Sequence, residues 1–334
     1  MPSTNKSSFK GPLFIIGMPR SGTKLLRGLL NQHPLIQIPS IETLFLPYLL
    51  INSRSFGDLS DPIAFRHFYN HITKFSYFTW TRKKGQLISE QDWYMNCRGF
   101  TPPEIFEALI RHDTQNPCYS DVIWGDKSPT YINHVALIQS AFPGARFIHI
   151  IRDVRDYCMS INKAWGKNML RAAQRWVDDL TRCNEQSRAF SLHLMTIKYE
   201  NLLGNAEIEL RKICDFLDVQ FCNSMLNLPQ PTENIGAAKG EKKIITTNQL
   251  KYLDKMDNSL LLSVESLTFP VLLQYGYNCN YFNEVNRIPK WKMFLYQLAD
   301  AVNVTRAGIK DHGISGTFKY SLFYWFIRKY EPWS

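Results

Sequence analysis

Short apolar runs alternate with segments of helical periodicity along this chain. Three runs have the length and composition of strands buried on both faces, namely Leu13–Gly17 (LFIIG), Arg146–Ile151 (RFIHII) and Leu194–Lys198 (LMTIK). Apolar residues recur at helical spacing over residues 23–32, 131–141, 157–165, 207–217 and 260–275. Strands that alternate with helices in this way predict an α/β fold, in which helices cover both faces of a central parallel sheet.

Two further segments are predicted to be insertions in that fold. Residues 61–111 mix charged and aromatic positions and are typical of helices, whereas residues 229–243 combine glycines with several lysines and predict a loop. No internal repeat and no linker stands out. We therefore expect one P-loop-like α/β domain over residues 1–286, with helical insertions, and a helical and aromatic extension of it over residues 287–334.

The composition indicates a folded chain with an anionic partner. Of the 334 residues, 45% are hydrophobic and 20% are charged, which excludes a disordered chain, a collagen-like chain and a small disulfide scaffold. Lys and Arg outnumber Asp and Glu by 39 to 29, so the formal net charge is +10. A charge of this size suggests a nucleotide, a phosphorylated cofactor, nucleic acid or an acidic membrane surface, without choosing among them.

The cysteines and the apolar stretches bear on the compartment. Seven scattered cysteines, with no C-x-x-C pair and no metal-ligand spacing, favour buried thiols in a reducing compartment. Uncharged stretches such as Thr43–Ser53 and Tyr320–Ile327 are shorter than the roughly 20 residues that a membrane-spanning helix needs. We therefore expect a cytoplasmic protein with no transmembrane segment and no metal site.

The turn after the first strand carries groups that suit an oxyanion. Residues 17–24 (GMPRSGTK) join a strand to a helix, where backbone N–H groups and the helix N-terminus attract anions. Gly22 lets the backbone approach closely, and Ser21 and Thr23 offer hydroxyl groups. Positive charge comes from Arg20 and Lys24. The spacing nearly matches a Walker A loop, but Thr-Lys follows the second glycine in place of Lys-Ser/Thr. The competing interpretation is an ordinary turn with a stray arginine.

A second phosphate-sized pattern follows the strand that ends at Ile151. Arg152 stands at the strand end and Ser160 stands eight residues later, so together they could grip one phosphate by charge and by a hydroxyl hydrogen bond. The alternative is a surface charge cluster over residues 152–156, which would contribute little energy.

Two single residues add to these patterns. Lys127 lies in Gly125–Pro129 (GDKSP), between two apolar segments, and could instead be a solvated turn lysine. Tyr199 lies in Lys198–Leu202 (KYENL), and could instead be a buried tyrosine at a strand end.

Together these motifs resemble the sulfotransferases that use 3′-phosphoadenosine 5′-phosphosulfate (PAPS). Pro19–Thr23 (PRSGT) is similar to their 5′-phosphosulfate loop, and Arg152 with Ser160 is similar to their 3′-phosphate motif. The Arg-Ser-Gly-Thr version is similar to the tyrosylprotein sulfotransferases and their bacterial relatives. The likeness covers residues 13–283. The chain departs from these relatives at Lys24, where they have threonine, and at Ala164, where they have arginine.

The resemblance implies a role for each candidate. The residues that would bind the nucleotide are Arg20, Ser21, Gly22, Thr23, Lys24, Arg152, Ser160 and Tyr199. Arg20 and Lys127 would stabilise the leaving oxygen, and Glu42, in a Glu-Thr pair, would be the catalytic carboxylate. The implied reaction is metal-independent, in-line transfer of the sulfuryl group from PAPS to a hydroxyl of a small metabolite, a sugar or a tyrosine, with 3′,5′-adenosine bisphosphate (PAP) as product.

The sequence alone leaves open which side chain acts as the catalytic base. Glu42 could start a helix that Ser40 caps, in which case its charge would serve the helix N-terminus. Two histidines are poorer candidates, because His33 precedes a proline at a helix end and His149 lies within an apolar strand.

Two other functions remain open at this point. A P-loop kinase or NTPase would need Gly-Lys-Ser/Thr and an acidic Mg²⁺ ligand at a strand end, where this chain has Arg152. A nucleic-acid-binding protein would suit the charge, but the basic residues gather at two phosphate-sized motifs instead of a stripe. We expect a hydroxylated acceptor as partner and no nucleic acid, and the chain could form a homodimer.

The aromatic tail is the last feature of note. Residues 317–334 (TFKYSLFYWFIRKYEPWS) could pack on the core, wall the acceptor pocket, bury themselves in a homodimer or rest on an acidic membrane surface. Among the functional options the acceptor wall is favoured.

Overall fold

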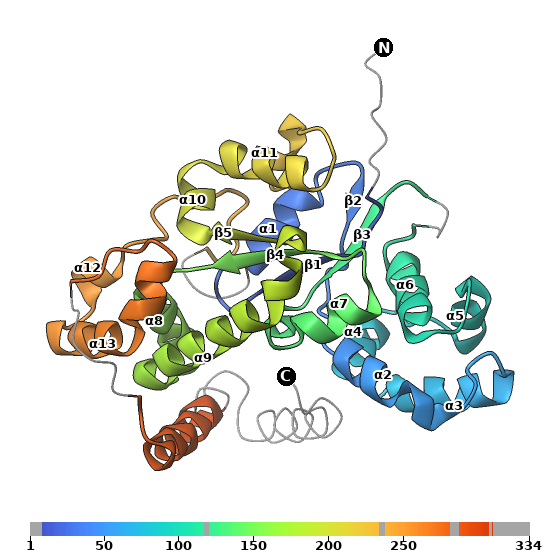
Figure 1. Ribbon diagram of the computed structural model, residues 1–334, viewed down its shortest axis with the longest axis horizontal. Coiled ribbons are helices and arrows are strands. Elements are labelled where there is room, and N and C mark those ends of the chain that lie inside the picture. The colour runs from blue at the N-terminus through green and yellow to red at the C-terminus, as the bar shows by residue number, and fades with distance from the viewer. Residues whose placement is uncertain (1–8, 117–119, 234–237, 281–286, 307–308, 310–334) are drawn as a thin grey trace.

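A five-stranded parallel sheet stands at the centre of the protein, in the order β2-β3-β1-β4-β5 (Figure 1). The computed structural model describes residues 9–116, 120–233, 238–280, 287–306 and 309. The strands are β1 (Leu13–Gly17), β2 (Ile36–Gln37), β3 (Ile123–Lys127), β4 (Arg146–Ile151) and β5 (Leu194–Lys198). The predicted α/β fold with a parallel sheet is confirmed, and β1, β4 and β5 have the predicted bounds.

Helices cover both faces of the sheet because side chains alternate along the buried strands. Leu13 and Ile15 of β1 pack in one core cluster with α1 (Thr23–Leu30), α10 (Tyr199–Gly204) and α11 (Ala206–Phe216). Phe14 and Ile16 point the other way into a larger cluster. The helices of that second layer are α2 (Leu46–Asn52), α3 (Pro62–Ile72), α4 (Ser76–Lys83), α5 (Glu90–Asn96), α6 (Pro102–Asp113), α7 (Val135–Ala141), α8 (Val154–Trp165), α9 (Met169–Ser187), α12 (Tyr252–Lys255) and α13 (Asn258–Gln274).

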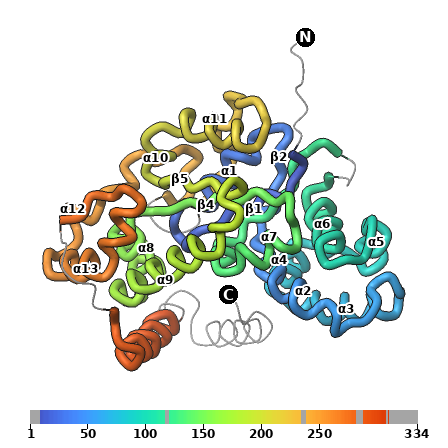
Figure 2. The backbone as a smooth tube through the Cα atoms, viewed as in Figure 1, coloured from blue at the N-terminus to red at the C-terminus, as the bar shows by residue number. Residues whose placement is uncertain are grey.

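The expected helical insertion lies between β2 and β3, where Figure 2 shows it as the blue and cyan part of the tube. Four of its helices, α3 to α6, occupy the residues for which helices were predicted, and α6 ends two residues beyond them. Aromatic side chains hold it together, since the ring of Trp93 lies 5.5 Å from that of Phe68 and 5.5 Å from that of Phe78. Single-turn 3₁₀ helices complete the fold: η1 (Ser53–Phe56), η2 (Pro129–Asn133), η3 (Arg188–His193) and η4 (Asn223–Leu226).

The hydrophobic pattern did not predict two strands, β2 and β3, and it predicted one helix where the structure has two. In β3, which reads IWGDK, Asp126 and Lys127 are buried although they are charged, so the strand has no apolar run. The helix predicted over residues 131–141 is two elements, η2 and α7, because His134 between them has non-helical dihedral angles (φ −132°, ψ 21°).

The sheet places the carboxyl ends of its strands at one edge. Ile15 of β1 lies beside Lys127 of β3 and beside Ile148 of β4, all in parallel register. The turn after β1, the residues after β3 and Arg152 after β4 therefore meet at the same edge, where ligands bind in open α/β sheets.

The last described element is a helix over residues 290–306. None of the helices in the described ranges combines the length and the apolar composition that crossing a membrane requires. The aromatic segment 317–334 lies outside the described residues.

Candidate active site

The turn between β1 and α1 packs tightly against Tyr199 and leads directly into a helix N-terminus. Gly22 has φ +93°, and a Cβ atom there would collide with the ring of Tyr199, so the position requires glycine. Helix α1 begins at the next residue, and the N–H groups of its first turn have no carbonyl one turn earlier to bind. The Ser21 hydroxyl is fully buried and has no hydrogen-bond partner within the described part of the chain.

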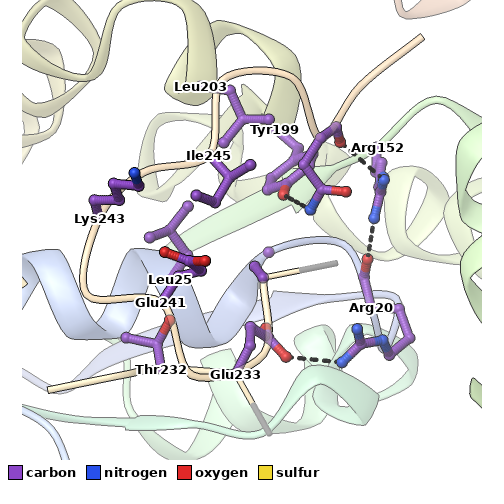
Figure 3. A pocket seen from close by; sticks show the side chains of 13 residues that line it. Arg20, Leu25, Arg152, Tyr199, Leu203, Thr232, Glu233, Glu241, Lys243 and Ile245 are labelled. Carbon is purple, nitrogen blue, oxygen red and sulfur yellow. Dashed lines mark hydrogen bonds and ion pairs between the residues drawn. The ribbon is translucent and has the colours of Figure 1, made fainter. Parts of the chain in front are cut away.

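Arg20 points from this turn into the centre of the site (Figure 3). Its Nη1 donates to Oε2 of Glu233 at 2.8 Å, and both side chains are largely shielded from solvent, at 13% and 14% exposed. Its Nε lies 3.5 Å from Oγ of Ser160, a long hydrogen bond that joins the two predicted phosphate motifs. The charge of Arg20 is therefore paired with a carboxylate from a distant part of the chain.

Arg152 lies against the same turn. Its Nη1 donates to the carbonyl of Arg20 and its Nη2 to the carbonyl of Asn248, each at 3.1 Å. The guanidinium stands 4.7 Å from the centre of the Tyr199 ring, and the Tyr199 hydroxyl accepts from Nδ2 of Asn248 at 2.8 Å. The Arg152 Nε is buried without a partner among the described residues. The structure thus brings Arg20, Arg152 and Tyr199 together, as the sequence predicted.

The neighbours of Arg152 do not form a surface charge cluster, so that alternative is wrong. Asp153, Arg155 and Asp156 are all buried. Arg155 forms ion pairs at 2.6 Å with Asp153 and with Glu265 of α13. It therefore attaches α8 to α13 and serves the fold, while Arg152 faces the site.

Arg20 and Arg152 line two neighbouring cavities. The smaller cavity has a volume of about 30 Å³, with room for about one water molecule. It lies between the turn that follows β1 and residues that include Glu233 and Asn248 (Figure 3). The larger has about 520 Å³, a volume typical of ligand sites, and Ser160 and Lys163 face it. Two more lysines, Lys251 and Lys255, also line the larger cavity.

A carboxylate and an ammonium meet at the end of β3. Lys127 donates a hydrogen bond to Oε1 of Glu42, and the lysine is buried while the glutamate side chain is 32% exposed. Burial lowers the pKa of Lys127, Glu42 acts to raise it, and nearby Arg27 and Lys24 lower it further. Lys127 is thus not a solvated turn lysine. Glu42 does not start a helix either, because α2 begins only at Leu46.

Hydrogen bonds fix the segment that carries Glu42. The hydroxyl of Thr43 donates to Oδ2 of Asp126 at 3.0 Å and lies 2.6 Å from the hydroxyl of Tyr131. The Leu44 N–H donates to Oγ of Ser128 at 3.3 Å. Burial raises the pKa of Asp126 to about 6, against the hydrogen bonds from Ser128 and Thr43. Glu42 is therefore held against the end of β3 by its neighbour in sequence.

Arg27, Glu233 and Asn248 are residues of the site that the sequence patterns missed. Arg27 donates to the carbonyl of Pro39 at 3.3 Å and to that of Ser40, and so braces the segment just before Glu42. Burial lowers its pKa, and Glu42, Asp126 and Glu233 act to raise it. Arg27 could have been identified from the sequence, because it is a basic residue on the leucine-rich helix. Glu233 and Asn248 lie in segments with no motif that would have identified them.

The two histidines are structural. His33 pairs through Nε2 with the carbonyl of Gln220 at 2.8 Å, and its Nδ1 accepts from the Leu35 N–H at 3.1 Å. His149 is fully buried in β4, and burial lowers its pKa to about 4, so it is neutral at physiological pH. Its prediction as a core residue is confirmed.

Comparisons with known proteins point to one family. A model of the sulfotransferase family matches residues 12–223. Protein-tyrosine sulfotransferase A of Caenorhabditis elegans is 23% identical over 290 residues, which are 80% of this chain and 67% of that protein. The protein-tyrosine sulfotransferase of Drosophila melanogaster is 26% identical over 223 residues, 64% of this chain but only 39% of that protein.

A solved structure supports the fold. The sulfotransferase domain from the curacin biosynthetic pathway superposes with a TM-score of 0.55 at 20% identity. The superposition covers 82% of this chain and all of that domain. The described architecture is therefore that of a known class of α/β protein.

Proposed function

The chain belongs to the sulfotransferase family, and we propose that it transfers the sulfuryl group of PAPS to the hydroxyl of an acceptor, with PAP as product. One observation carries the proposal: two anion-binding motifs and a Glu–Lys pair meet at the carboxyl edge of one parallel sheet. Family membership favours this reaction over a P-loop kinase or NTPase and over nucleic-acid binding.

The turn after β1 and the start of α8 are proposed to hold the two ends of PAPS. Buried polar atoms at Ser21 and Arg152 that lack partners in the described structure, together with the surrounding cations, suit a doubly phosphorylated nucleotide. The proposed ligands of the 5′ end are Arg20, Ser21, Gly22, Thr23 and Lys24, and those of the 3′-phosphate are Arg152 and Ser160. Tyr199 is proposed to contact the nucleoside. PAPS supplies the sulfuryl group and a stable leaving group when it binds.

Glu42, Lys127 and Arg20 are proposed to act on the atoms that react, Glu42 on the acceptor hydroxyl and the two cations on the leaving oxygen. Sulfuryl transfer resembles phosphoryl transfer, in which an enzyme mainly aligns the reactants and neutralises charge that develops on the leaving oxygen. The Glu42 carboxylate accepts the proton of the acceptor hydroxyl. The ammonium of Lys127 and the guanidinium of Arg20 offset the negative charge on the leaving oxygen. Because Lys127 is buried, its charge is little screened by water.

The names of the relatives suggest which class of acceptor to test first. Two of them are named protein-tyrosine sulfotransferases, so we propose the tyrosine hydroxyl as the first acceptor to test, with sugars and small metabolites next. We likewise propose that residues 1–286 form the catalytic domain and that residues 287–334 extend it. The cytoplasmic location and the homodimer stay predictions, which cell fractionation and analytical ultracentrifugation would test.

The decisive experiment combines turnover with binding. The purified protein is incubated with PAPS and a panel of tyrosine peptides, sugars and phenols, and mass spectrometry detects the gain of a sulfuryl group. In parallel, PAP should raise the melting temperature and ATP with Mg²⁺ should raise it much less. Equal stabilisation by ATP with Mg²⁺, or no sulfated product with any acceptor class while PAP fails to bind, would contradict the proposal.

A further inference from the structure

The 290–306 helix presents an apolar face to solvent. Its large apolar side chains Trp291, Phe294, Leu295, Leu298 and Val302 are between 49% and 66% exposed. Their spacing of three, four, seven and eleven residues places them on one side of a helix. Scattered exposed apolar residues are normal on a protein surface, but five on one helix face form a contiguous patch that indicates an interaction site.

The opposite side of this helix is bound to the body of the protein, so the apolar face is directed outward. Oδ1 of Asp300 accepts from the Asn168 N–H at 2.6 Å, and its Oδ2 forms an ion pair with Arg171 at 2.7 Å. Asn303 donates to the carbonyl of Gly166 at 2.9 Å. All three partners lie at the start of α9 or just before it. Figures 1 and 2 show the helix at the margin of the molecule, close to α9 and α13.

The exposed charged residues of this helix are all basic. Lys290, Lys292 and Arg306 are exposed, and the only acidic residue of the helix is Asp300, which is buried against the body. Lysine and arginine beside a face of Trp, Phe and Leu are the pattern of a helix that lies in the plane of a membrane surface. Anionic lipid headgroups would complement the basic residues while the apolar face enters the acyl boundary.

We propose that the 290–306 helix docks this protein on a membrane surface that contains anionic lipid. The helix lies along the surface and does not cross it, since charged residues interrupt its described part, which therefore lacks the run of roughly 20 apolar residues of a spanning segment. The proposal concerns where the protein works and is independent of the reaction at the sheet edge.

A second copy of the chain fits the same face less well. Five side chains exposed to this degree offer on the order of 500 Å², less than the roughly 800 Å² that each partner of a stable interface buries. Two such helices packed face to face would also bring lysines and arginines together with no exposed acidic residue to pair with them, and like charges repel. A lipid surface has no such lower limit of area and supplies the opposite charge.

Vesicle sedimentation of the full chain tests the proposal. The protein should sediment with vesicles of phosphatidylcholine and phosphatidylserine, much less with phosphatidylcholine alone, and less as salt is raised, because surface charges are screened. The double variant Phe294→Glu with Leu298→Glu should lose the binding. Replacing both Lys290 and Lys292 with Gln should weaken it by about tenfold or more.

A matched control separates this helix from apolar exposure in general. Leu192 of η3 is 89% exposed on another element, and Leu192→Glu should leave vesicle binding unchanged. All variants should keep the wild-type circular dichroism spectrum, which shows that the helix variants remain folded.

Three outcomes would overturn the proposal. Wild-type protein could fail to sediment with anionic vesicles, or the Phe294→Glu, Leu298→Glu variant could bind as well as wild type, which would assign the binding to another segment. A concentration-dependent dimer in ultracentrifugation that this same variant abolishes would instead assign the face to a second copy.

Discussion

Glu233→Gln should strengthen the binding of PAP, because Glu233 forms an ion pair with Arg20, the cation that we propose to bind the 5′ end of the nucleotide. Its carboxylate lies 2.8 Å from Nη1 of Arg20 beside a cavity of about 30 Å³. A bound nucleotide must replace this ion pair before Arg20 can bind it. Gln keeps the shape and one weaker hydrogen bond but removes the negative charge.

The expected gain combines two terms. A hydrogen bond between charged groups contributes about 1.5–3 kcal/mol and one with a neutral acceptor about 0.5–1.5 kcal/mol, so the competing contact weakens by about 1 kcal/mol. A carboxylate about 6 Å from a nucleotide anion also repels it by up to about 3 kcal/mol at an effective dielectric of about 20. Part of that repulsion is relieved when the carboxylate moves, so we expect a total of about 1–3 kcal/mol, which is roughly 5- to 150-fold in affinity.

Isothermal titration calorimetry with PAP at low and physiological salt measures this change. Glu241→Gln is the matched control, because Glu241 lines the same small cavity and no ion pair joins it to Arg20 in the described structure. It should change the affinity much less. The ligand-free Glu233→Gln protein should also melt at a lower temperature, since the ion pair with Arg20 becomes a weaker hydrogen bond. Unchanged or weaker PAP binding by Glu233→Gln would refute the reasoning and show that Glu233 does not compete with the nucleotide.

Three further substitutions test other parts of the site. Glu42→Gln should lower turnover by about 10²–10⁴ with little change in PAP affinity, because it removes the proton acceptor and keeps the shape; near-normal steady-state rates would exclude Glu42 as the base. Arg152→Ala should weaken PAP binding by about 1.5–3 kcal/mol in calorimetry, the contribution of a charged hydrogen bond, and an unchanged affinity would move the 3′-phosphate elsewhere. Burial raises the pKa of Asp126 to about 6 from 3.8, so the folded state binds its proton more tightly than the unfolded chain and loses stability as pH rises through 6. Asp126→Asn should therefore be more stable than wild type by about 3 kcal/mol at pH 8, with the difference fading toward pH 4 in urea unfolding; a difference independent of pH would contradict this burial cost.

Local patterns were sufficient for the fold class and for the position of the residues that we propose to bind the nucleotide. A buried strand, a glycine turn and an amphipathic helix are encoded by adjacent residues. The positions of β1, of the turn after it and of α1 were therefore predicted from the sequence. The same holds for β4 with Arg152, because the carboxyl end of a parallel strand projects its next residues toward the sheet edge. Helix α8, by contrast, begins at Val154, three residues before the predicted helix. Arg20, Arg152 and Tyr199 meet there as expected.

The remaining features depend on which strands are neighbours, and no local pattern encodes that order. Lys127 meets Glu42, 85 residues earlier in the chain, because β3 lies between β2 and β1. Strand β3 was not predicted because it contains two charged residues. Their partners come from a distant part of the chain, Thr43 for Asp126 and Glu42 for Lys127. Glu233 likewise reaches Arg20 from 213 residues away in the chain. A buried charge is tolerated only beside its partner, so only the folded chain decides which charged residues lie inside the site and which lie in solvent.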